Sequence, residues 1–351
     1  MPPAVPLPSD ESEPPAAPPR HHGRRAQGRA CQRRQTGASQ PKHTRSSWRS
    51  KGTWQFPGNF SSATAPRRHA GGRPAAIGSQ AMRVAVLIPA AGYSKRYAEA
   101  DPLGGARSKL DEDLGGRPVL QRTVELFANY ASPDVTIAGI VVAGPHDEAA
   151  FDEFRLRYGD KMGLLGVSIC RGGKTHRYET VKAALDHVPA DATHVAVHDA
   201  ARPCASQALL DRVFDAASRH PAVVPAIEVS DTLKRLSDEE VDDPGADPLA
   251  AILGAGKRHP LRAVEATVER DRLVAVQTPQ VYEAALLKEV YAQSNIDCTD
   301  DATLVERLGR RVVVVEGDPL NVKITRPVDL RIARAVLGVS GPAERPVHKR
   351  F

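Results

Sequence analysis

The sequence predicts an α/β protein with a Rossmann-like, mostly parallel sheet, helices on both faces, a protruding β-arm and a disordered N-terminal tail. From about residue 82 to 338, short apolar, β-branched runs alternate with segments of helical spacing, which is typical of right-handed βαβ units. The alternation is interrupted once, between about 231 and 280. Residues 1–81 are rich in Pro, Arg, Ser and Gly and have no sustained period.

The first strand is expected at 84–88, a continuous apolar run that suits burial on both faces of a parallel sheet. It leads into Ala-Ala-Gly at 90–92, where nearly absent side chains let a ligand lie on the backbone. The cations Arg96 and Lys109 follow. A buried strand, a small-residue turn and then cations are typical of a phosphate site. An ordinary strand–loop–helix junction with incidental surface cations has the same pattern.

Further strands are expected at 137–143, 167–170, 194–198 and 223–227, alternating with helices at 119–130, 147–158, 178–187 and 207–218. After the interruption, a strand at 312–316 and helices at 282–293, 301–308 and 327–337 complete the domain, and Pro327 suits a first helical turn. Ligands bind such sheets beyond the carboxyl ends of the strands. Gly92, Gly172 and Asp199 all follow expected strands, so we expect a site at that edge.

The interruption is predicted to be the β-arm. Short strand candidates at 232–236 and 273–277 flank a segment, 237–260, that is first acidic and then rich in glycine and proline, as loops are. We therefore expect a tail at 1–81, one domain at 82–338 that carries the arm at about 231–280, and a flexible end at 339–351.

The tail carries most of the basic charge. It has 13 Lys or Arg and 3 acidic residues, a charge of +10, so the rest of the chain carries −4 of the formal total of +6. Its composition cannot bury enough apolar area to offset the entropy of ordering, which predicts disorder. An organellar transit peptide, a basic arm for nucleic acid, and an extension upstream of a start at Met82 are all open interpretations.

Other bulk features limit the class of protein. No apolar run approaches the roughly 18–20 residues that span a bilayer, so no membrane association is expected. The four cysteines show no Cys-x-x-Cys spacing, which argues against a zinc site or a disulfide framework and fits a reducing cytosol. We expect a cytoplasmic bacterial protein, or a plastid protein if residues 1–81 are a transit peptide.

Polar side chains fall at the expected ligand edge. Gly172 and Gly173 allow a base or phosphate to approach closely, and Thr180 lies just inside the next helix. Asp199 follows a buried strand, where its carboxylate could hold Mg²⁺ or a ribose hydroxyl, or simply cap a helix or turn.

Two cations near this edge have ordinary interpretations as well. Arg202 lies three residues after Asp199, where an arginine can form a surface salt bridge. Lys323 lies beside an expected strand end, where a single lysine is usually solvated. Neither residue is diagnostic without its context.

Taken together, the motifs resemble the 2-C-methyl-D-erythritol 4-phosphate cytidylyltransferase family over about residues 83–338. They are highly specific as a set, although Ala-Ala-Gly alone marks only the wider nucleotidyltransferase superfamily. In order they are Pro-Ala-Ala-Gly at 89–92, Arg96, Lys109, Gly-Gly at 172–173, Val-His-Asp-Ala-Ala-Arg-Pro at 197–203, Asp-Thr-Leu-Lys at 231–234, Thr-Val-Glu-Arg at 267–270, Gln-Thr-Pro-Gln at 277–280, Thr-Asp-Asp-Ala-Thr at 299–303 and Asn-Val-Lys-Ile-Thr at 321–325.

The resemblance implies that CTP and methylerythritol phosphate give the CDP-alcohol and pyrophosphate, with Mg²⁺, in non-mevalonate synthesis of isoprenoid precursors. It implies a homodimer in which the arms exchange, so that Arg270 acts in the partner's site. The implied roles are transition-state stabilisation (Arg96, Lys109), positioning of the alcohol phosphate (Arg270, Lys323), nucleotide binding (Ala90, Ala91, Gly92, Gly172, Gly173, Thr180, Asp199), substrate binding (Arg202, Thr232, Thr278) and metal binding (Asp199).

The chain departs from the family's pattern in places. The loop before Lys109 is longer and glycine-rich, Thr180 replaces the usual serine with its hydroxyl kept, and the loop at 238–260 is longer than usual. We interpret His198 as a packed strand-end histidine and not as a catalytic base, because a phosphate nucleophile is already ionised.

Two other functions stay open. A ribitol-phosphate cytidylyltransferase has much the same base-binding half and differs on the alcohol side. A non-catalytic or nucleic-acid-binding role would rest on the tail, since the domain has no basic, aromatic-bearing face. The presence of Arg96, Lys109, Asp199, Arg270 and Lys323 argues against an inactive enzyme.

Overall fold

β1 (Met82–Pro89) lies in the interior of the main sheet, and its apolar run is buried on both faces as predicted. The structure is a computed structural model that describes residues 81–92, 97, 108–241 and 261–341. β1 pairs in parallel with β2 (Val135–Gly144) on one side and with β4 (His194–Val197) on the other. The strands that follow extend the sheet from this parallel core.

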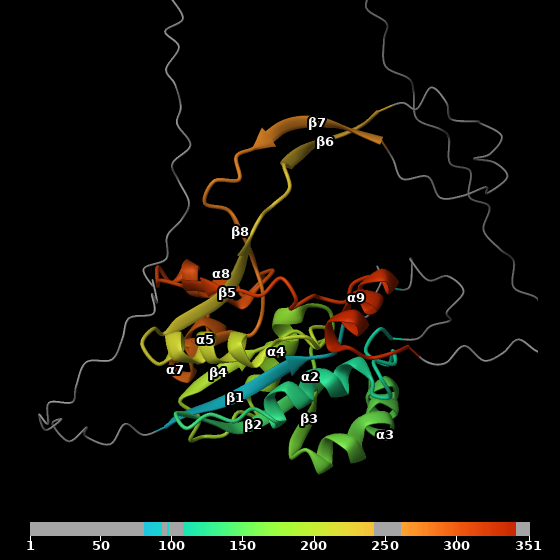
Figure 1. The fold of residues 1–351 in the computed structure, drawn as a ribbon. Coiled ribbons are helices and arrows are strands. Elements are labelled where there is room, and N and C mark those ends of the chain that lie inside the picture. The colour runs from blue at the N-terminus through green and yellow to red at the C-terminus, as the bar shows by residue number, and fades with distance from the viewer. Residues whose placement is uncertain (1–80, 93–96, 98–107, 242–260, 342–351) are drawn as a thin grey trace, which may run out of the picture. The chain divides into compact units, whose positions relative to one another are not determined.

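The main sheet has the strand order β10-β5-β9-β4-β1-β2-β3, with β8 paired to β5. Figure 1 labels β1 to β5 and β8 of this sheet. β3, β5 and β10 run parallel to β1, whereas β8 and β9 are antiparallel to the strands beside them. The chain adds β2 and β3 on one side of β1 and then returns to its other side with β4. This reversal is the topological switch point at which such sheets bind ligands. The bounds are β3 (Val167–Arg171), β5 (Ala222–Glu228), β8 (Val274–Val276), β9 (Gln280–Glu283) and β10 (Val313–Glu316).

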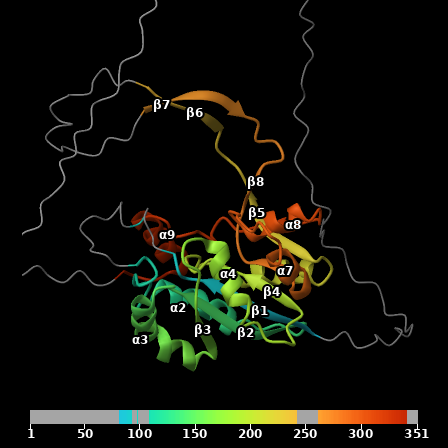
Figure 2. The same cartoon turned by 180° about the vertical axis from the view of Figure 1, so that it is seen from behind.

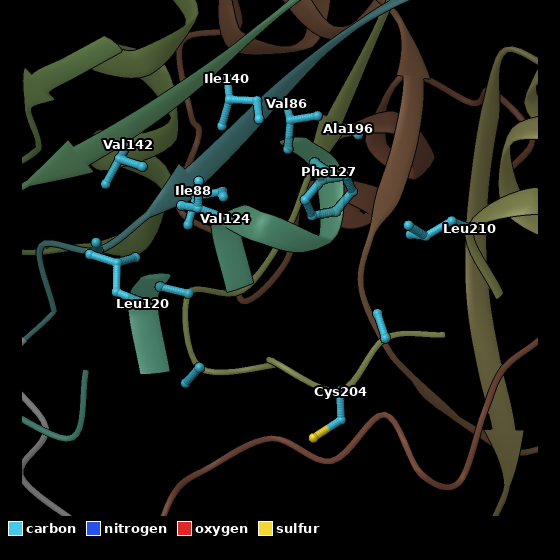
Figure 3. Packing of buried hydrophobic residues seen from close by; sticks show 14 of the residues in the cluster. Val86, Ile88, Leu120, Val124, Phe127, Ile140, Val142, Ala196, Cys204 and Leu210 are labelled. Atoms are coloured by element: carbon cyan, nitrogen blue, oxygen red, sulfur yellow. The ribbon is translucent and has the colours of Figure 1, made fainter. Parts of the chain in front are cut away.

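Helices cover both faces of the sheet, as predicted (Figure 2). One core contains Val86 and Ile88 together with α2, α3, α5 and α9, and Figure 3 shows part of it. The other core contains Leu87 together with α4, α7 and α8. This alternation is the period-two burial of a strand between two layers. The helices are α2 (Val119–Ala128), α3 (Glu148–Leu164), α4 (Arg177–Leu185), α5 (Gln207–Ala217), α7 (Ala284–Tyr291), α8 (Asp301–Arg307) and α9 (Pro327–Leu337).

Local signals fix several helix ends. Asp147 and Ser206 accept hydrogen bonds from backbone N–H groups in the first turns of α3 and α5. α9 begins at Pro327 as predicted and ends at Gly338, whose φ of 63° is the left-handed conformation that glycine tolerates best. No helix in the described ranges is long and apolar enough to cross a membrane.

The predicted arm is partly confirmed. β6 (Leu233–Val241) and β7 (Leu261–Val268) pair antiparallel with each other in a separate two-stranded sheet, and most of their side chains are exposed. The predicted extent of 231–280 was too long, because β8 and β9 belong to the main sheet. The predicted loop at 237–260 began too early, since β6 continues to Val241, and 242–260 lie outside the described residues.

Two strands were missed. β9 lies between β4 and β5, where the sequence suggested the start of a helix at 282; that helix is α7 and begins at Ala284. β7 was not predicted, because its alternating pattern contains charged residues on an exposed ribbon. The predictions for residues 1–80 and 342–351 lie outside the described part of the chain.

Candidate active site

The turn after β1 is open to ligands. Ala90 is buried and its N–H donates to the carbonyl of Ala143 at 2.8 Å, which fixes the turn to the end of β2. Gly92 is exposed, and among the described residues no atom would lie within 4 Å of a Cβ at that position. The predicted small-residue turn therefore presents its backbone at the carboxyl edge of the sheet.

The turn after β3 packs tightly against the first turn of α4. A Cβ on Gly172 would lie 2.6 Å from the carbonyl oxygen of Gly144 and 2.8 Å from both Ala91 Cβ and Thr180 Cγ2. A Cβ on Gly173 would lie 2.7 Å from the nitrogen of Thr180, and the Gly173 N–H donates to Thr180 Oγ1 at 3.1 Å. Residues predicted to bind the nucleotide from three segments thus meet at Gly172.

We expect Gly172→Ala to lower the free energy of unfolding by about 1–3 kcal/mol, the usual cost of overpacking. The displaced turn should also raise KM for CTP. Urea unfolding and steady-state kinetics measure the two effects. Gly159→Ala is the matched control, because a Cβ there meets nothing within 4 Å and alanine in a helix should raise stability by up to about 1 kcal/mol. Unchanged stability and KM in Gly172→Ala would contradict the tight packing.

Asp199, two residues beyond the end of β4, is surrounded by three cations. Lys323 Nζ lies 2.9 Å and Arg202 Nε 3.2 Å from Oδ2, while Arg177 Nε lies 3.7 Å from Oδ1. Burial alone would raise the pKa of Asp199, but Lys323, Arg177 and Arg202 hold that pKa well below its usual range. The carboxylate is therefore ionised at neutral pH, and its environment is cationic.

The segment that carries Lys323 is fixed to this edge by Asn321. The Asn321 side-chain amide donates to the carbonyl of Thr278 at 2.9 Å, and its own backbone carbonyl accepts from Arg202 Nη1 at 2.7 Å. The Arg202 and Asp199 side chains are each 11% exposed, so the salt bridge between them is largely buried and does not lie on the surface. Arg202, Thr278 and Lys323 thus lie together around Asp199, although the sequence separates them widely.

His198 is fully buried between two hydrogen-bond partners. Nε2 lies 3.0 Å from the carbonyl of Arg202, so this nitrogen donates. Nδ1 then accepts from Thr278 Oγ1 at 3.2 Å, and Thr278 Oγ1 itself accepts from the Asp199 N–H at 3.0 Å. Burial lowers the pKa of His198 to about 4, so the ring is neutral at pH 7. Both ring nitrogens are engaged, which agrees with a packed histidine.

This burial makes stability depend on pH. The unfolded pKa is about 6.5 and the folded pKa about 4, so stability is complete above pH 6.5 and is lost as the pH falls from 6.5 to 4. We expect His198 to remove about 2 kcal/mol of unfolding free energy between pH 7 and pH 5. The pKa of His194 is lowered too, in the same direction. Urea unfolding of wild type and His198→Gln at both pH values separates the contributions of His198 and His194. An equal loss of unfolding free energy in both proteins would contradict the role of His198.

Of the remaining residues predicted for catalysis or on the arm, the structure describes Lys109, Thr232 and Arg270. Arg96 lies outside the described residues. Lys109 is half-buried in a turn directly before buried Leu110, whose carbonyl accepts from the Tyr158 hydroxyl of α3 at 3.1 Å. Thr232 is exposed before β6, and Arg270 is exposed after β7, where its guanidinium donates to the carbonyl of Ser230. Among the contacts of the described residues, none joins Thr232 or Arg270 to Asp199.

Two site residues were missed by the sequence analysis, Arg177 and Asp301. Arg177 opens α4, bonds to Asp301 at 2.7 Å and lies near Asp199. Burial alone would lower the pKa of Arg177, but Asp301 and Asp199 raise it, so the guanidinium stays charged. A cation in the helical turn that follows the glycine pair was the available signal. Asp301 was noticed only as part of the Thr-Asp-Asp-Ala-Thr motif.

A family model described as 2-C-methyl-D-erythritol 4-phosphate cytidylyltransferase matches residues 84–246 and 242–339. The chain belongs to this family. It is similar to the cytidylyltransferase of that name from Streptomyces coelicolor, with 39% identity over 74% of this chain and 87% of the relative. The relative from Symbiobacterium thermophilum is 38% identical over 72% of this chain and 92% of its own length.

Solved structures agree with the family and the fold. The crystal structure of 2-C-methyl-D-erythritol 4-phosphate cytidylyltransferase from Thermus thermophilus has a TM-score of 0.51 and 30% identity, and covers 74% of this chain and 100% of that chain. The predicted family resemblance and the mostly parallel α/β sheet of this cytidylyltransferase family member are therefore confirmed.

Proposed function

We propose that this chain transfers the cytidylyl group of CTP to 2-C-methyl-D-erythritol 4-phosphate, releasing pyrophosphate, in non-mevalonate isoprenoid-precursor synthesis. The observation that carries the proposal is the cluster at the switch point of a member of this family. There the 172–173 turn, Thr180 and a cationic group around Asp199 adjoin one sheet edge. A site for a nucleoside triphosphate combines turns that let the ligand approach the backbone with cations that stabilise its phosphates.

In the reaction, a phosphate oxygen of the alcohol phosphate attacks the α-phosphorus of CTP. A new P–O bond forms as the bond between the α-phosphorus and the bridging oxygen of pyrophosphate breaks. The attacking phosphate is already ionised, so the protein need not remove a proton. Its work is to position two anions and to stabilise the negative charge that grows on the phosphoryl oxygens.

Cations are suited to that work. Lys323 is 39% exposed while it pairs with Asp199, so its ammonium can also meet an incoming phosphate. We assign Lys323 the role of positioning the alcohol phosphate, together with Thr232 and Arg270 on the arm. Arg96 and Lys109 follow the turn after β1 in the sequence. From that place we assign them the role of stabilising the negative charge of the transition state.

The nucleotide is assigned to the two small-residue turns. Gly92 leaves its backbone open to the phosphates, and Gly173 binds the Thr180 hydroxyl that adjoins the expected base position. Arg202 and Thr278 hold the Asp199 side of the site, so their contribution to substrate binding is to fix that carboxylate.

Mg²⁺ fits this site only together with CTP. No group of three or more His, Cys, Asp or Glu side chains in the described ranges could hold a metal ion alone. Asp199 and Asp301 with the three cations Arg177, Arg202 and Lys323 carry a net charge of +1, which disfavours a dication. The negative charge of the triphosphate outweighs the net positive charge of the cluster, and Asp199 can then supply one carboxylate ligand to Mg²⁺. When bound, the ion would neutralise charge on the phosphate oxygens.

We therefore expect Mg²⁺ alone to leave the melting temperature unchanged, because the empty cluster is cationic. CTP with Mg²⁺, at about a hundred times its Kd, should stabilise the fold by about 2.7 kcal/mol, more than the same CTP with EDTA. Differential scanning fluorimetry measures all three conditions. A clear rise with Mg²⁺ alone would mean that the protein has a metal site of its own.

A homodimer formed through β6 and β7 is the proposed assembly. The ribbon exposes apolar side chains on both strands, including Leu236 and Val264, and it carries the exposed Arg270 beside it. An isologous pairing would let each ribbon complete the partner's site. A cytoplasmic location remains a prediction, and so does a plastid location if residues 1–81 are a transit peptide.

Purified protein with CTP, Mg²⁺ and each candidate alcohol phosphate tests the proposal. Pyrophosphate release should show a kcat/KM for methylerythritol phosphate at least about a hundredfold above that for ribitol 5-phosphate, since unpaired polar groups penalise the wrong alcohol. A preference for ribitol 5-phosphate would keep the cytidylyl transfer and replace the acceptor. CTP should also exceed ATP and GTP by a similar factor.

A further inference from the structure

Asp301 is a fully buried carboxylate next to the candidate site. It is the first residue of α8, but Asp300 already caps that helix by accepting from the N–H of Thr303. The Asp301 side chain instead accepts from the Tyr291 hydroxyl at 2.5 Å and from Arg177 Nη1 at 2.7 Å. The second aspartate of the Thr-Asp-Asp-Ala-Thr motif thus serves Arg177 and not its own helix.

Arg177 lies between two carboxylates and bonds only one of them closely. Its Nη1 is at hydrogen-bonding distance from Asp301, whereas its Nε is 3.7 Å from Asp199 Oδ1, beyond that distance. The charges still interact at this separation, and Arg177 contributes to the low pKa of Asp199. Arg177 therefore influences Asp199 through its charge without donating a hydrogen bond to it.

The contacts of Asp199 are divided between its oxygens. The closest approaches of Lys323 and Arg202 are both to Oδ2. Oδ1 faces Arg177 across the longer separation. A donor or ion brought by the nucleotide can therefore be received by Oδ1, provided that the guanidinium does not move onto it.

We infer that Asp301 is a positioning residue that holds Arg177 beside Asp199 but out of hydrogen-bonding reach, so that Oδ1 stays available to CTP. A guanidinium is a rigid fork that matches a carboxylate in bidentate fashion. Without the charge of Asp301, Arg177 keeps Asp199 as its carboxylate partner and closes onto it. The inference rests on the proposed function, because it assumes that Asp199 receives a group of the nucleotide.

The test compares CTP binding by calorimetry, in the presence of Mg²⁺, for wild type, Asp301→Asn and the double variant Asp301→Asn with Arg177→Met. Asp301→Asn should raise the Kd for CTP about tenfold, as expected for one lost hydrogen bond to a charged group. The double variant removes the released guanidinium and should return to within about threefold of wild type, a coupling that a double-mutant cycle measures. A merely structural role of the pair would not give recovery on the second substitution.

Matched controls use Asp215 and Arg219, an exposed pair on α5 and after it, joined at 2.7 Å. Asp215→Asn and its combination with Arg219→Met should leave the Kd for CTP unchanged. If Asp301→Asn does not fold, Tyr291→Phe is used in its place. This substitution removes the hydrogen bond from the Tyr291 hydroxyl to Asp301 and leaves Asp301 paired with Arg177. That variant should raise the Kd about threefold, by loss of a single hydrogen bond, and adding Arg177→Met should cancel the rise.

The outcomes are distinct. A double variant that binds CTP as weakly as Asp301→Asn, or more weakly, would mean that Arg177 itself assists binding, and the inference would be wrong. Wild-type Kd in Asp301→Asn would also overturn it, while leaving the proposed function intact. If wild type does not bind CTP at all, the proposed function fails first, and the inference fails with it.

Discussion

Asp199→Ala should lower kcat/KM for CTP by about 10³-fold or more, the largest single-residue effect that we expect, equivalent to roughly 4 kcal/mol of transition-state stabilisation. Asp199 is the one carboxylate that pairs with Lys323, Arg202 and Arg177 together within the described part of the chain. Steady-state kinetics with varied CTP and varied alcohol phosphate measure the effect.

The magnitude combines separate losses. The alanine variant removes an acceptor for the nucleotide, and a hydrogen bond to a charged group is worth about 1.5–3 kcal/mol. It also frees Lys323 and Arg202, whose like charges then repel at close range, and displacement of a positioned group can cost about 10²-fold in rate. Because Lys323 serves the alcohol phosphate in our assignment, both substrates should be affected.

Asp199→Asn should be intermediate, since it keeps the shape and an acceptor oxygen but loses the charge. Asp215→Ala is the control, because Asp215 is an exposed carboxylate whose salt bridge to Arg219 lies on α5 and the residues after it. Circular dichroism should show folded protein in each case. If Asp199→Ala keeps kcat/KM within about threefold of wild type, less than 1 kcal/mol, Asp199 is not at the reacting centre.

Arg270→Ala should lower kcat/KM for the alcohol phosphate by about 10²-fold, as expected for loss of two charge-assisted hydrogen bonds to a phosphate. CTP binding should change little, because Arg270 has no described contact with the Asp199 cluster. Arg270→Lys should not restore activity, since an ammonium cannot reproduce the bidentate fork. Arg155→Ala, which changes an exposed arginine on α3 to which we assign no role, is the control.

The same residue tests the proposed exchange between subunits. Arg270→Ala chains and Asp199→Ala chains, each nearly inactive alone, are mixed under conditions that let subunits exchange. A random mixture of two-site dimers would recover about a quarter of wild-type activity, because each heterodimer has one site with both residues intact. No recovery despite demonstrated exchange would mean that Arg270 acts in its own chain or has no role.

Much of the fold follows from sequence periodicity alone. The strand at 84–88 and the strand before Asp199 were predicted because buried parallel strands are continuously apolar. β9 was missed because four residues next to Pro279 provide too short a pattern, and only pairing with β4 and β5 makes them a strand. The extent of the arm was misjudged for the same reason, since tertiary pairing decides where the main sheet resumes.

Several residues of the site could be predicted from the sequence, but their contacts with other side chains could not. Asp199, Arg202 and Lys323 were expected at one edge, and they meet there. Arg177 and Asp301 were not identified, because they lie 124 positions apart and their pairing depends on how α4 and α8 pack. A charged residue at a helix start looks like an ordinary capping residue until its partner is known.

The most direct measurement follows the α-phosphorus of CTP. Wild-type protein is incubated with Mg²⁺, methylerythritol phosphate and CTP radiolabelled at that phosphorus, the products are separated by chromatography, and the radioactivity in each product is counted. We predict that the label appears in a CDP-alcohol with two linked phosphorus atoms, with one pyrophosphate released for each molecule formed. Label that stays in CTP, or appears in free CMP without the CDP-alcohol, would contradict it.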